Sequence, residues 1–503
     1  MSAVTTQVAE PTQNRMSLRP YRGLIPYYEE DAPFFFGREL ERKIIIANLM
    51  ASRLTLFYGP SGVGKSSILN AGVVHHFQAA AEDNRSKDGS RKLAVVAFRE
   101  WGPIDPIPAL VRKVDEVLSR DLGDRESKPT GADRGLMETL HMWEEHLRGS
   151  IYILLDQFEE YFVYPRPSSS STFADDLAEV IRQRKLPVNF LISIRDDALA
   201  KLDHFEGTIP NLFDNYIRIE HLTREGAREA INGPIEEYNR RCVDPNEHVE
   251  VEALLADAVL DQVQAGRVYL GQAGRGVAPT SHQDAEADAR VEAPYLQLVM
   301  TALWDEEVSH RSHKLQLGTL NRLGGSVQIV RTHLDNTLNT LPGDDQDVAA
   351  AIFRFLVTPS GSKIAHTAAD LAEYSIQPVQ AVKRVLGRLA ASDTRILRQV
   401  ASPTGGTDDV RYEIFHDVLA PAVLDWRTRH ELSKAADAKS RAERWAGLAS
   451  ATTAFLLLGT SSVTLYSVLT GRSISGYQFV VVGGALLVTI LAPTVNWLWR
   501  LRR

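Results

Sequence analysis

The amino-acid sequence predicts an α/β fold with a parallel sheet, followed by a helical region, a winged-helix-like region and two C-terminal transmembrane helices. Strand-like apolar runs alternate with helical segments between Arg53 and Leu222, as in sheets whose strands are joined by helical crossovers. A glycine-rich loop connects the first of these runs to a helix. Residues 445–471 and 473–499 contain no charged residue, and each segment is long enough to cross a bilayer as a helix.

Each predicted strand is a short and nearly continuous apolar run, as expected where both faces of a sheet are buried. The predicted strands are Leu54–Tyr58, Leu93–Phe98, Ile151–Leu155, Val188–Ile194 and Tyr216–Ile219. The segment Thr223–Asn339 is mainly helical. From Val348 onward, the order helix, helix, helix, strand, glycine-rich turn, strand is typical of a winged helix. Gln377–Ala390 is its third helix and Pro403–Asp409 its wing.

Composition and charge exclude several classes of protein. At 503 residues the chain is too long for one ordinary domain, so we expect about three. The net charge of -8 argues against a general nucleic-acid-binding protein, which is usually basic. The single cysteine, Cys242, rules out an intramolecular disulfide and fits a reducing cytoplasm. Residues 1–15 are polar and lack the apolar core of a secretion signal.

The loop after the first predicted strand has the pattern G-x-x-x-x-G-K-[ST], which binds the phosphates of a nucleoside triphosphate. Its glycines let successive backbone N–H groups wrap around phosphate oxygens. Lys65 would reach the β- and γ-phosphates of ATP, and Ser66 would offer its hydroxyl to Mg²⁺. The alternative, a glycine turn that binds nothing, is disfavoured by the strand–loop–helix context. The predicted nucleotide-binding residues here are Gly59, Pro60, Ser61, Gly62, Val63, Gly64, Lys65, Ser66 and Ser67.

A second element of the predicted site is the acidic segment after the strand Ile151–Leu155. Asp156 stands at the end of this strand, where a carboxylate can hold the metal opposite a phosphate-binding loop. Gln157 follows, at the position where many ATPases of the AAA+ type have the glutamate that activates water. Glu159 or Glu160 could take the role of this base, with Glu159 preferred. The alternative is that both glutamates only cap or solvate the next helix.

Arg195 stands at the end of the strand Val188–Ile194, where a parallel sheet presents residues to a ligand. We expect its guanidinium to sense or stabilise the γ-phosphate. It could instead form a structural ion pair with Asp196 or Asp197. Lys65, Asp156, Glu159 and Arg195 together form the predicted catalytic set, and Ser66 and Asp156 the predicted Mg²⁺ ligands.

The flanks of the two apolar C-terminal segments predict how they cross a membrane. Three basic residues precede the first segment, three follow the second, and the loop between them holds only Arg472. This distribution is typical of a hairpin with both ends in the cytoplasm, and it places the protein in the inner membrane. The lipid bilayer would then contact residues 445–471 and 473–499. The alternative is a soluble hydrophobic hairpin.

Several motifs together resemble those of the bacterial novel STAND family of signalling NTPases. The similar segments are Pro20–Leu24, Glu30–Glu39, Asp156–Glu160, the strand that bears Arg195, and Phe415–Leu419 with Trp426. The resemblance spans about residues 20–429. It implies an AAA+-like P-loop core, a helical lid and a winged-helix domain that close over ATP or ADP. The chain departs from the common family plan because it lacks a WD-type propeller.

The resemblance also implies roles for residues outside the loop. Phe36, Gly37 and Arg38 would lie near the adenine and ribose. Pro294 matches a helical-domain proline that contacts nucleotide, although it could only start a helix. His416 would contact the β-phosphate and lock the ADP state, although it could be a core histidine.

The third helix of the winged-helix region carries Lys383, Arg384 and Arg388, which could face a DNA groove. The acidic chain and the expected packing against the nucleotide-binding core favour a structural role instead. We therefore do not expect a nucleic-acid partner.

These observations predict a membrane-anchored STAND ATPase that acts as a switch. ADP would hold a closed monomer, and ATP would promote homo-oligomerisation and cluster the hairpins, as in a defence or cell-death effector with slow hydrolysis. The trigger is not evident. The alternatives are a tethered scaffold or receptor that recruits partners and an ATP-driven transport or membrane-remodelling motor. The predicted domain limits are 1–19 (disordered tail), 20–45 (N-terminal family motif), 46–222 (core), 223–345 (helical lid), 346–429 (winged helix), 430–444 (stalk) and 445–503 (hairpin).

Overall fold

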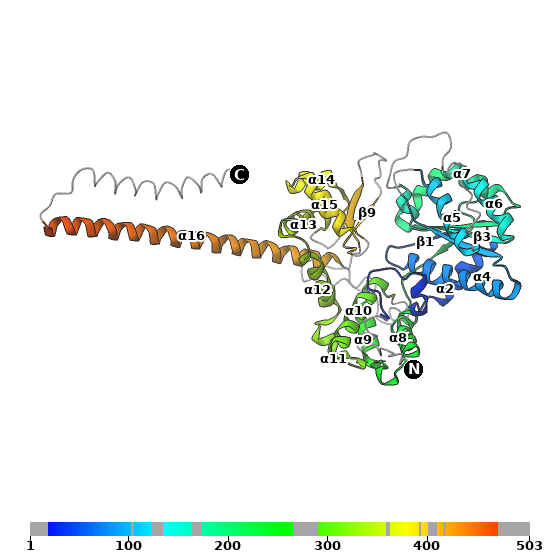
Figure 1. Cartoon of the computed structure of the whole chain (residues 1–503), viewed down its shortest axis with the longest axis horizontal. Helices are drawn as coiled ribbons and strands as arrows, with labels where there is room; N and C mark the ends of the chain where they lie inside the picture. The colour runs from blue at the N-terminus through cyan, green and yellow to red at the C-terminus, as the bar shows by residue number, and fades with distance from the viewer. Residues whose placement is uncertain are drawn as a thin grey trace, which may run out of the picture. The chain divides into compact units, whose positions relative to one another are not determined.

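The computed structural model in Figure 1 divides into two compact units, Met1–Arg427 and Thr428–Arg503. It describes residues 19–101, 105–122, 134–162, 173–264, 290–358, 363–391, 394–400, 410–415 and 419–470. Most of the predicted disordered tail, the predicted wing and His416 lie outside these ranges. The limits predicted between the core, the helical lid and the winged helix remain predictions.

A five-stranded sheet forms the centre of the first unit, with the strand order β2-β3-β4-β1-β5. Every neighbouring pair in it is parallel. The strands are β1 (Leu54–Gly59), β2 (Leu93–Phe98), β3 (Ser150–Leu155), β4 (Val188–Arg195) and β5 (Tyr216–Arg218). The predicted parallel α/β core is therefore confirmed.

Successive strand residues point to opposite sides of this sheet, so it has two apolar faces. Helices cover both of them. Leu154 packs in one apolar cluster, whereas its neighbours Ile153 and Leu155 pack in the other. The helices that contribute to the first cluster are α2 (Glu39–Ala51), the π-helix η2 (Ile68–Val74) and α4 (His75–Asp88). The helices of the second are α5 (Pro106–Leu122), α6 (Leu136–Leu147) and α7 (Phe173–Arg182). Both faces are buried, which explains the continuous apolar runs.

The helical region that follows shares a third apolar cluster with the winged-helix region. Leu296, Leu334 and Val385 are all fully buried members of this cluster. The helices of the region are α8 (Arg224–Arg241), α9 (Ala253–Gln262), α10 (Ala293–Ser309), α11 (Leu317–Arg322) and α12 (Gly325–Asn339). Two short parallel strands, β6 (Glu250–Val251) and β7 (Lys314–Leu315), pair within it.

The next elements have the order of a winged helix: helix, strand, helix, helix, strand, strand. They are α13 (Gly343–Leu356), β8 (His366–Thr367), α14 (Ala368–Ser375), α15 (Val379–Leu389), β9 (Leu397–Val400) and β10 (Arg411–Ile414). The three strands form an antiparallel sheet with the order β8-β10-β9. Arg384 and Arg388 of α15 both pair with Asp345 of α13. Two of the three cations considered for DNA binding therefore form ion pairs within the winged-helix region.

Helix α16 (Ala420–Thr470) is 51 residues long and includes the predicted stalk. Across the residues that the structure describes, no helix is both long and apolar enough to cross a membrane. Serine, threonine and glycine interrupt the apolar side chains of residues 445–470. The second predicted span, 473–499, lies outside the described residues. A hairpin requires both spans, so the prediction of two transmembrane helices is wrong, and the inner-membrane location and the bilayer contact that depended on it are withdrawn.

Candidate nucleotide-binding site

The predicted phosphate-binding loop connects β1 to a helical turn, α3 (Lys65–Ser67). Gly62 and Gly64 have φ angles of 78° and 93°, in the left-handed region that glycine adopts without strain. The Lys65 Nζ donates hydrogen bonds to the carbonyl oxygens of Gly59 and Pro60, at 2.7 and 2.9 Å. The loop is therefore held in a closed curve around its own lysine.

A cavity of about 620 Å³ opens beside this loop, within the range of roughly 300–1,000 Å³ that is typical of small-ligand pockets. Most of the predicted site residues line it. They are Phe36, Arg38, Ser61, Gly62, Val63, Gly64, Lys65, Ser66, Ser67, Asp156, Glu159, Arg195 and Pro294. Gly37, Gly59 and Pro60 are not among the lining residues, and His416 lies outside the described part of the chain. The fold thus brings together side chains from distant segments.

The acidic side of the cavity begins at the end of β3. Trp101 Nε1 donates to the backbone oxygen of Asp156 at 2.7 Å, which fixes the strand end. Asp156 Oδ1 and Glu159 Oε2 are buried and accept no hydrogen bond from the described residues. Gln157, with φ of 56°, turns the chain sharply between them. Unpartnered buried carboxylate oxygens fit a cation or a water network at this position.

A magnesium ion would find few protein ligands here. The described residues contain no group of three or more His, Cys, Asp or Glu side chains that could hold a metal ion. Mg²⁺ commonly binds through one or two protein oxygens together with water and substrate phosphates. Ser66 and the unpartnered Asp156 oxygen fit such a site. When bound with nucleotide, the ion would neutralise phosphate charge.

Lys65 and Glu159 influence each other electrostatically inside the cavity. Burial lowers the pKa of Lys65, and the charges of Glu159 and Asp156 oppose this change. Burial likewise raises the pKa of Glu159, opposed by the charges of Lys65 and Arg195. The predicted catalytic residues therefore share one environment. Glu159 could act as a base there once its environment favours the carboxylate form.

Arg195 is the last residue of β4 and lies opposite Gly59 in the β1–β4 ladder. Its buried guanidinium forms an ion pair with Asp197. The same nitrogen lies 3.7 Å from Glu413 Oε1, on the winged-helix sheet. Both predicted roles therefore fit its position: Arg195 faces the cavity, and it also has a structural partner, which is Asp197 rather than Asp196.

Arg38 braces the phosphate-binding loop. Its Nη2 donates to the carbonyl oxygens of Val63 and Glu220, at 2.9 and 2.8 Å, and its Nη1 pairs with Glu41. Gly37 has a φ of 83°, and a Cβ there would lie 2.0 Å from the carbonyl oxygen of Gly226. This segment thus supports the loop, and its contact with adenine and ribose stays a prediction.

Helix α10 contributes Pro294 and Gln297 to the cavity lining. Pro294 occupies the first turn of the helix, so it both starts the helix and faces the cavity. Gln297 Oε1 accepts from the Tyr27 hydroxyl at 3.0 Å and from the Arg22 backbone N–H at 3.1 Å. The N-terminal motif is therefore tied directly to the helical region.

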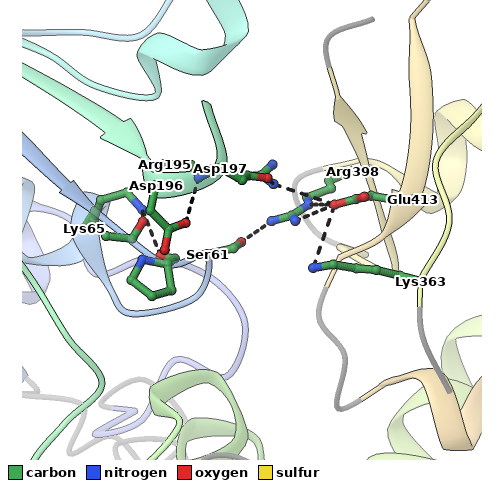
Figure 2. Close-up of polar contacts among 10 residues, drawn as sticks. Ser61, Lys65, Arg195, Asp196, Asp197, Lys363, Arg398 and Glu413 are labelled. Atoms are coloured by element: carbon green, nitrogen blue, oxygen red, sulfur yellow. Dashed lines mark hydrogen bonds and ion pairs between the residues drawn. The ribbon is translucent and has the colours of Figure 1, made fainter. Parts of the chain in front are cut away.

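The sequence did not predict the charged residues that the winged-helix sheet adds to this site. Arg398 of β9 and Arg395, which precedes this strand, line the cavity, and Glu413 of β10 pairs with Arg398. Figure 2 shows Arg398 and Glu413 facing Ser61 and Arg195 across the site. No motif marks these residues, and the sequence near them did not indicate what they contact.

This arrangement can be compared with known proteins. Residues 20–453 match the family model described as Novel STAND NTPase 1. The chain belongs to the novel STAND NTPase 1 family. The predicted family resemblance is confirmed, and as a member of this family of NTPases the chain is a nucleotide-binding protein. No curated protein matches the chain.

Among solved structures, similar chains have low sequence identity to this STAND NTPase. The Aeropyrum pernix ORC1 protein, solved in complex with DNA, is 15% identical, with 78% of this chain and 93% of that chain covered and a TM-score of 0.41. The Aeropyrum pernix ORC2 protein, solved as ADPNP–ADP complexes, is 11% identical, with 79% of this chain and 95% of that chain covered and a TM-score of 0.40. A Walker-type ATPase of Pyrococcus abyssi is 14% identical, with 79% of this chain and 98% of that chain covered and a TM-score of 0.37. TM-scores this low do not establish a shared architecture.

Glu160 makes the stability of this STAND NTPase dependent on pH. Its pKa is raised from 4.5 to about 7, first by burial and then by the charges of Glu159 and Asp156, while Arg99 and Arg395 oppose the rise. Between these two pH values the unfolded chain has released the proton and the folded chain still holds it. The free energy of unfolding therefore falls as the pH rises through this window.

We expect Glu160→Gln, which resembles the protonated form, to match the wild type below pH 4.5 and to be more stable by about 3 kcal/mol above pH 7. Urea unfolding of the nucleotide-free chain at several pH values measures this difference. A difference that stays constant across the window would show that Glu160 does not titrate in this way.

Proposed function

We propose that the protein is a switch controlled by ATP and ADP. The observation that carries this proposal is the contact between Arg398 of the winged-helix sheet and the hydroxyl of Ser61 in the phosphate-binding loop. Because one cavity is lined by both parts, a change in the bound phosphates can alter how they dock. ADP would favour the closed form, and ATP would favour release and homo-oligomerisation.

In this proposal hydrolysis resets the switch and does not drive continuous work. Gln157 stands where many related ATPases have a catalytic glutamate, which is consistent with slow turnover. Glu159 would act as the base, Asp156 and Ser66 would hold Mg²⁺, and Lys65 and Arg195 would contact the phosphates. Pro294, on the lining of the cavity, would contact the nucleotide from the helical region. The output of the switch would be self-assembly.

Nucleotide exchange in the full-length protein tests this proposal. We expect purified protein to carry ADP, to be monomeric with ADP, and to form a larger assembly with a non-hydrolysable ATP analogue. Mass photometry or light scattering measures the change in mass. Lys65→Ala serves as the control and should stay monomeric under both conditions.

The same mass with both nucleotides would contradict the switch. Rapid ATP turnover without any assembly would instead favour a motor. Retention of assembly in Lys65→Ala would show that the assembly does not depend on this site.

A further inference from the structure

We propose that Arg398 is a ligand for the β-phosphate of bound ADP, supplied by the winged-helix sheet, and that Glu413 positions it. The inference rests on the proposed function, because it takes the cavity beside the phosphate-binding loop as the nucleotide site. It adds a residue that no sequence motif marks, and it identifies how the winged-helix region would sense the phosphates.

The position of Arg398 is the first observation. It lies on β9, 337 residues from Ser61, yet its Nη1 donates to the Ser61 hydroxyl and its side chain lines the cavity. Ser61 belongs to the loop whose backbone N–H groups would hold the β- and γ-phosphates. A phosphate bound in that loop would therefore lie close to the Arg398 guanidinium, which contacts Ser61 (Figure 2).

Glu413 is the second observation. It lies opposite Arg398 in the β9–β10 ladder, so the two side chains leave the same face of the sheet. Its Oε1 accepts from Arg398 Nε at 2.7 Å and also from Arg398 Nη2. Two bonds to one carboxylate fix the plane of the guanidinium and direct its remaining edge, with Nη1, toward the loop.

The balance of charge is the third observation. The same Glu413 oxygen lies 3.7 Å from Arg195 Nη2 and 3.8 Å from Lys363 Nζ, so one carboxylate oxygen is shared by three cations. The side chains of Arg398 and Glu413 are both 11% exposed, which limits compensation by water. Buried cations are costly unless anions pair with them. Arg195 also pairs with Asp197, whereas Arg398 Nη1 donates to a neutral hydroxyl. A phosphate would give this edge of the guanidinium a charged acceptor, and the guanidinium fork matches its geometry.

Phosphate binding would therefore be coupled to docking of the winged-helix sheet. If Arg398 contacts the phosphate, the bound nucleotide stabilises the contact between β9 and the loop. By thermodynamic linkage, docking of the sheet must strengthen nucleotide binding by the same factor. Removal of Arg398 should therefore weaken the binding of ADP, the nucleotide that favours the docked form.

The test compares Arg398→Met with Arg388→Met in the full chain. Arg388 is a matched control, because it lies in the same region and pairs with Asp345, which retains Arg384 as a second partner. We expect Arg398→Met to weaken ADP binding by about ten- to a hundredfold, measured by competition against a fluorescent ADP analogue. The control should bind within twofold of the wild type. AMP, which has no β-phosphate, should bind all variants equally.

Two further variants address a loss caused by misfolding. Arg398→Lys keeps the charge and loses the fork, so it should show an intermediate loss. Glu413→Gln should also weaken ADP binding, because the guanidinium is no longer held by a charged partner. The proposal is overturned if Arg398→Met binds ADP like the control, or if it loses AMP and ADP affinity equally. If Lys65→Ala also binds ADP normally, the proposed site itself is wrong; if only Arg398→Met does, the site stands and this inference fails.

Discussion

Replacing Lys65 with alanine is expected to weaken ADP and ATP binding by about a hundredfold or more. The ammonium group is partly buried at the centre of the loop, where it donates to the carbonyl oxygens of Gly59 and Pro60. Bound phosphates would replace these neutral acceptors with charged ones, and charge-assisted hydrogen bonds in a buried site are the strong ones. Equilibrium binding of a fluorescent ADP analogue measures the loss.

Lys87→Ala is the matched control for this variant. Lys87 pairs with Asp83 on the exposed surface of α4, so its removal changes the net charge equally without affecting the cavity. Its affinity for ADP should equal that of the wild type. Normal binding by a folded Lys65→Ala protein would place the nucleotide elsewhere in the molecule.

Gly37→Ala is expected to cost about 3 kcal/mol or more of unfolding free energy, for two separate reasons. At φ of 83° the backbone is in a conformation that alanine adopts only with strain. The added Cβ would also lie 2.0 Å from the carbonyl oxygen of Gly226, a backbone atom that cannot move aside cheaply. Because Arg38 follows directly, the displaced segment would also withdraw support from the loop.

Gly89→Ala separates the two causes. Gly89 has a φ of 72°, and no atom lies within 4 Å of a Cβ at this position. This variant should therefore show only the backbone strain, about 1 to 2 kcal/mol. Denaturant unfolding of both variants gives the comparison. Equal losses would mean that the contact between Gly37 and Gly226 does not constrain the fold.

Local features of the sequence were sufficient to predict the core. The central strands of the sheet were visible because strands buried on both faces become uninterrupted apolar runs, such as that of Val188–Ile194. The edge strand β5 is more exposed, and its run is short and includes Arg218. The phosphate-binding loop was visible because its glycines, Lys65 and Ser66 are neighbours in the chain. The Asp156 segment was visible for the same reason, since it immediately follows an apolar strand.

Other predictions failed or were incomplete where local pattern was not sufficient. Absence of charge in residues 445–470 suggested a membrane span, but serine, threonine and glycine lower the apolarity that such a span requires. The position of Arg38 near adenine and ribose stays a prediction, and its motif gave no sign of its hydrogen bonds to Val63 and Glu220. A motif specifies which residue is present and leaves open which partner it meets.

The sequence by itself determined the parallel α/β core, the phosphate-binding loop and its acidic counterpart, because each depends on residues a few positions apart. Only the tertiary structure decided what closes the cavity. Arg398 and Ser61 are 337 positions apart, and Arg195 meets Glu413 only after the winged-helix sheet has docked. Such contacts depend on how whole elements pack, and the periodicity of a single segment carries no information about them.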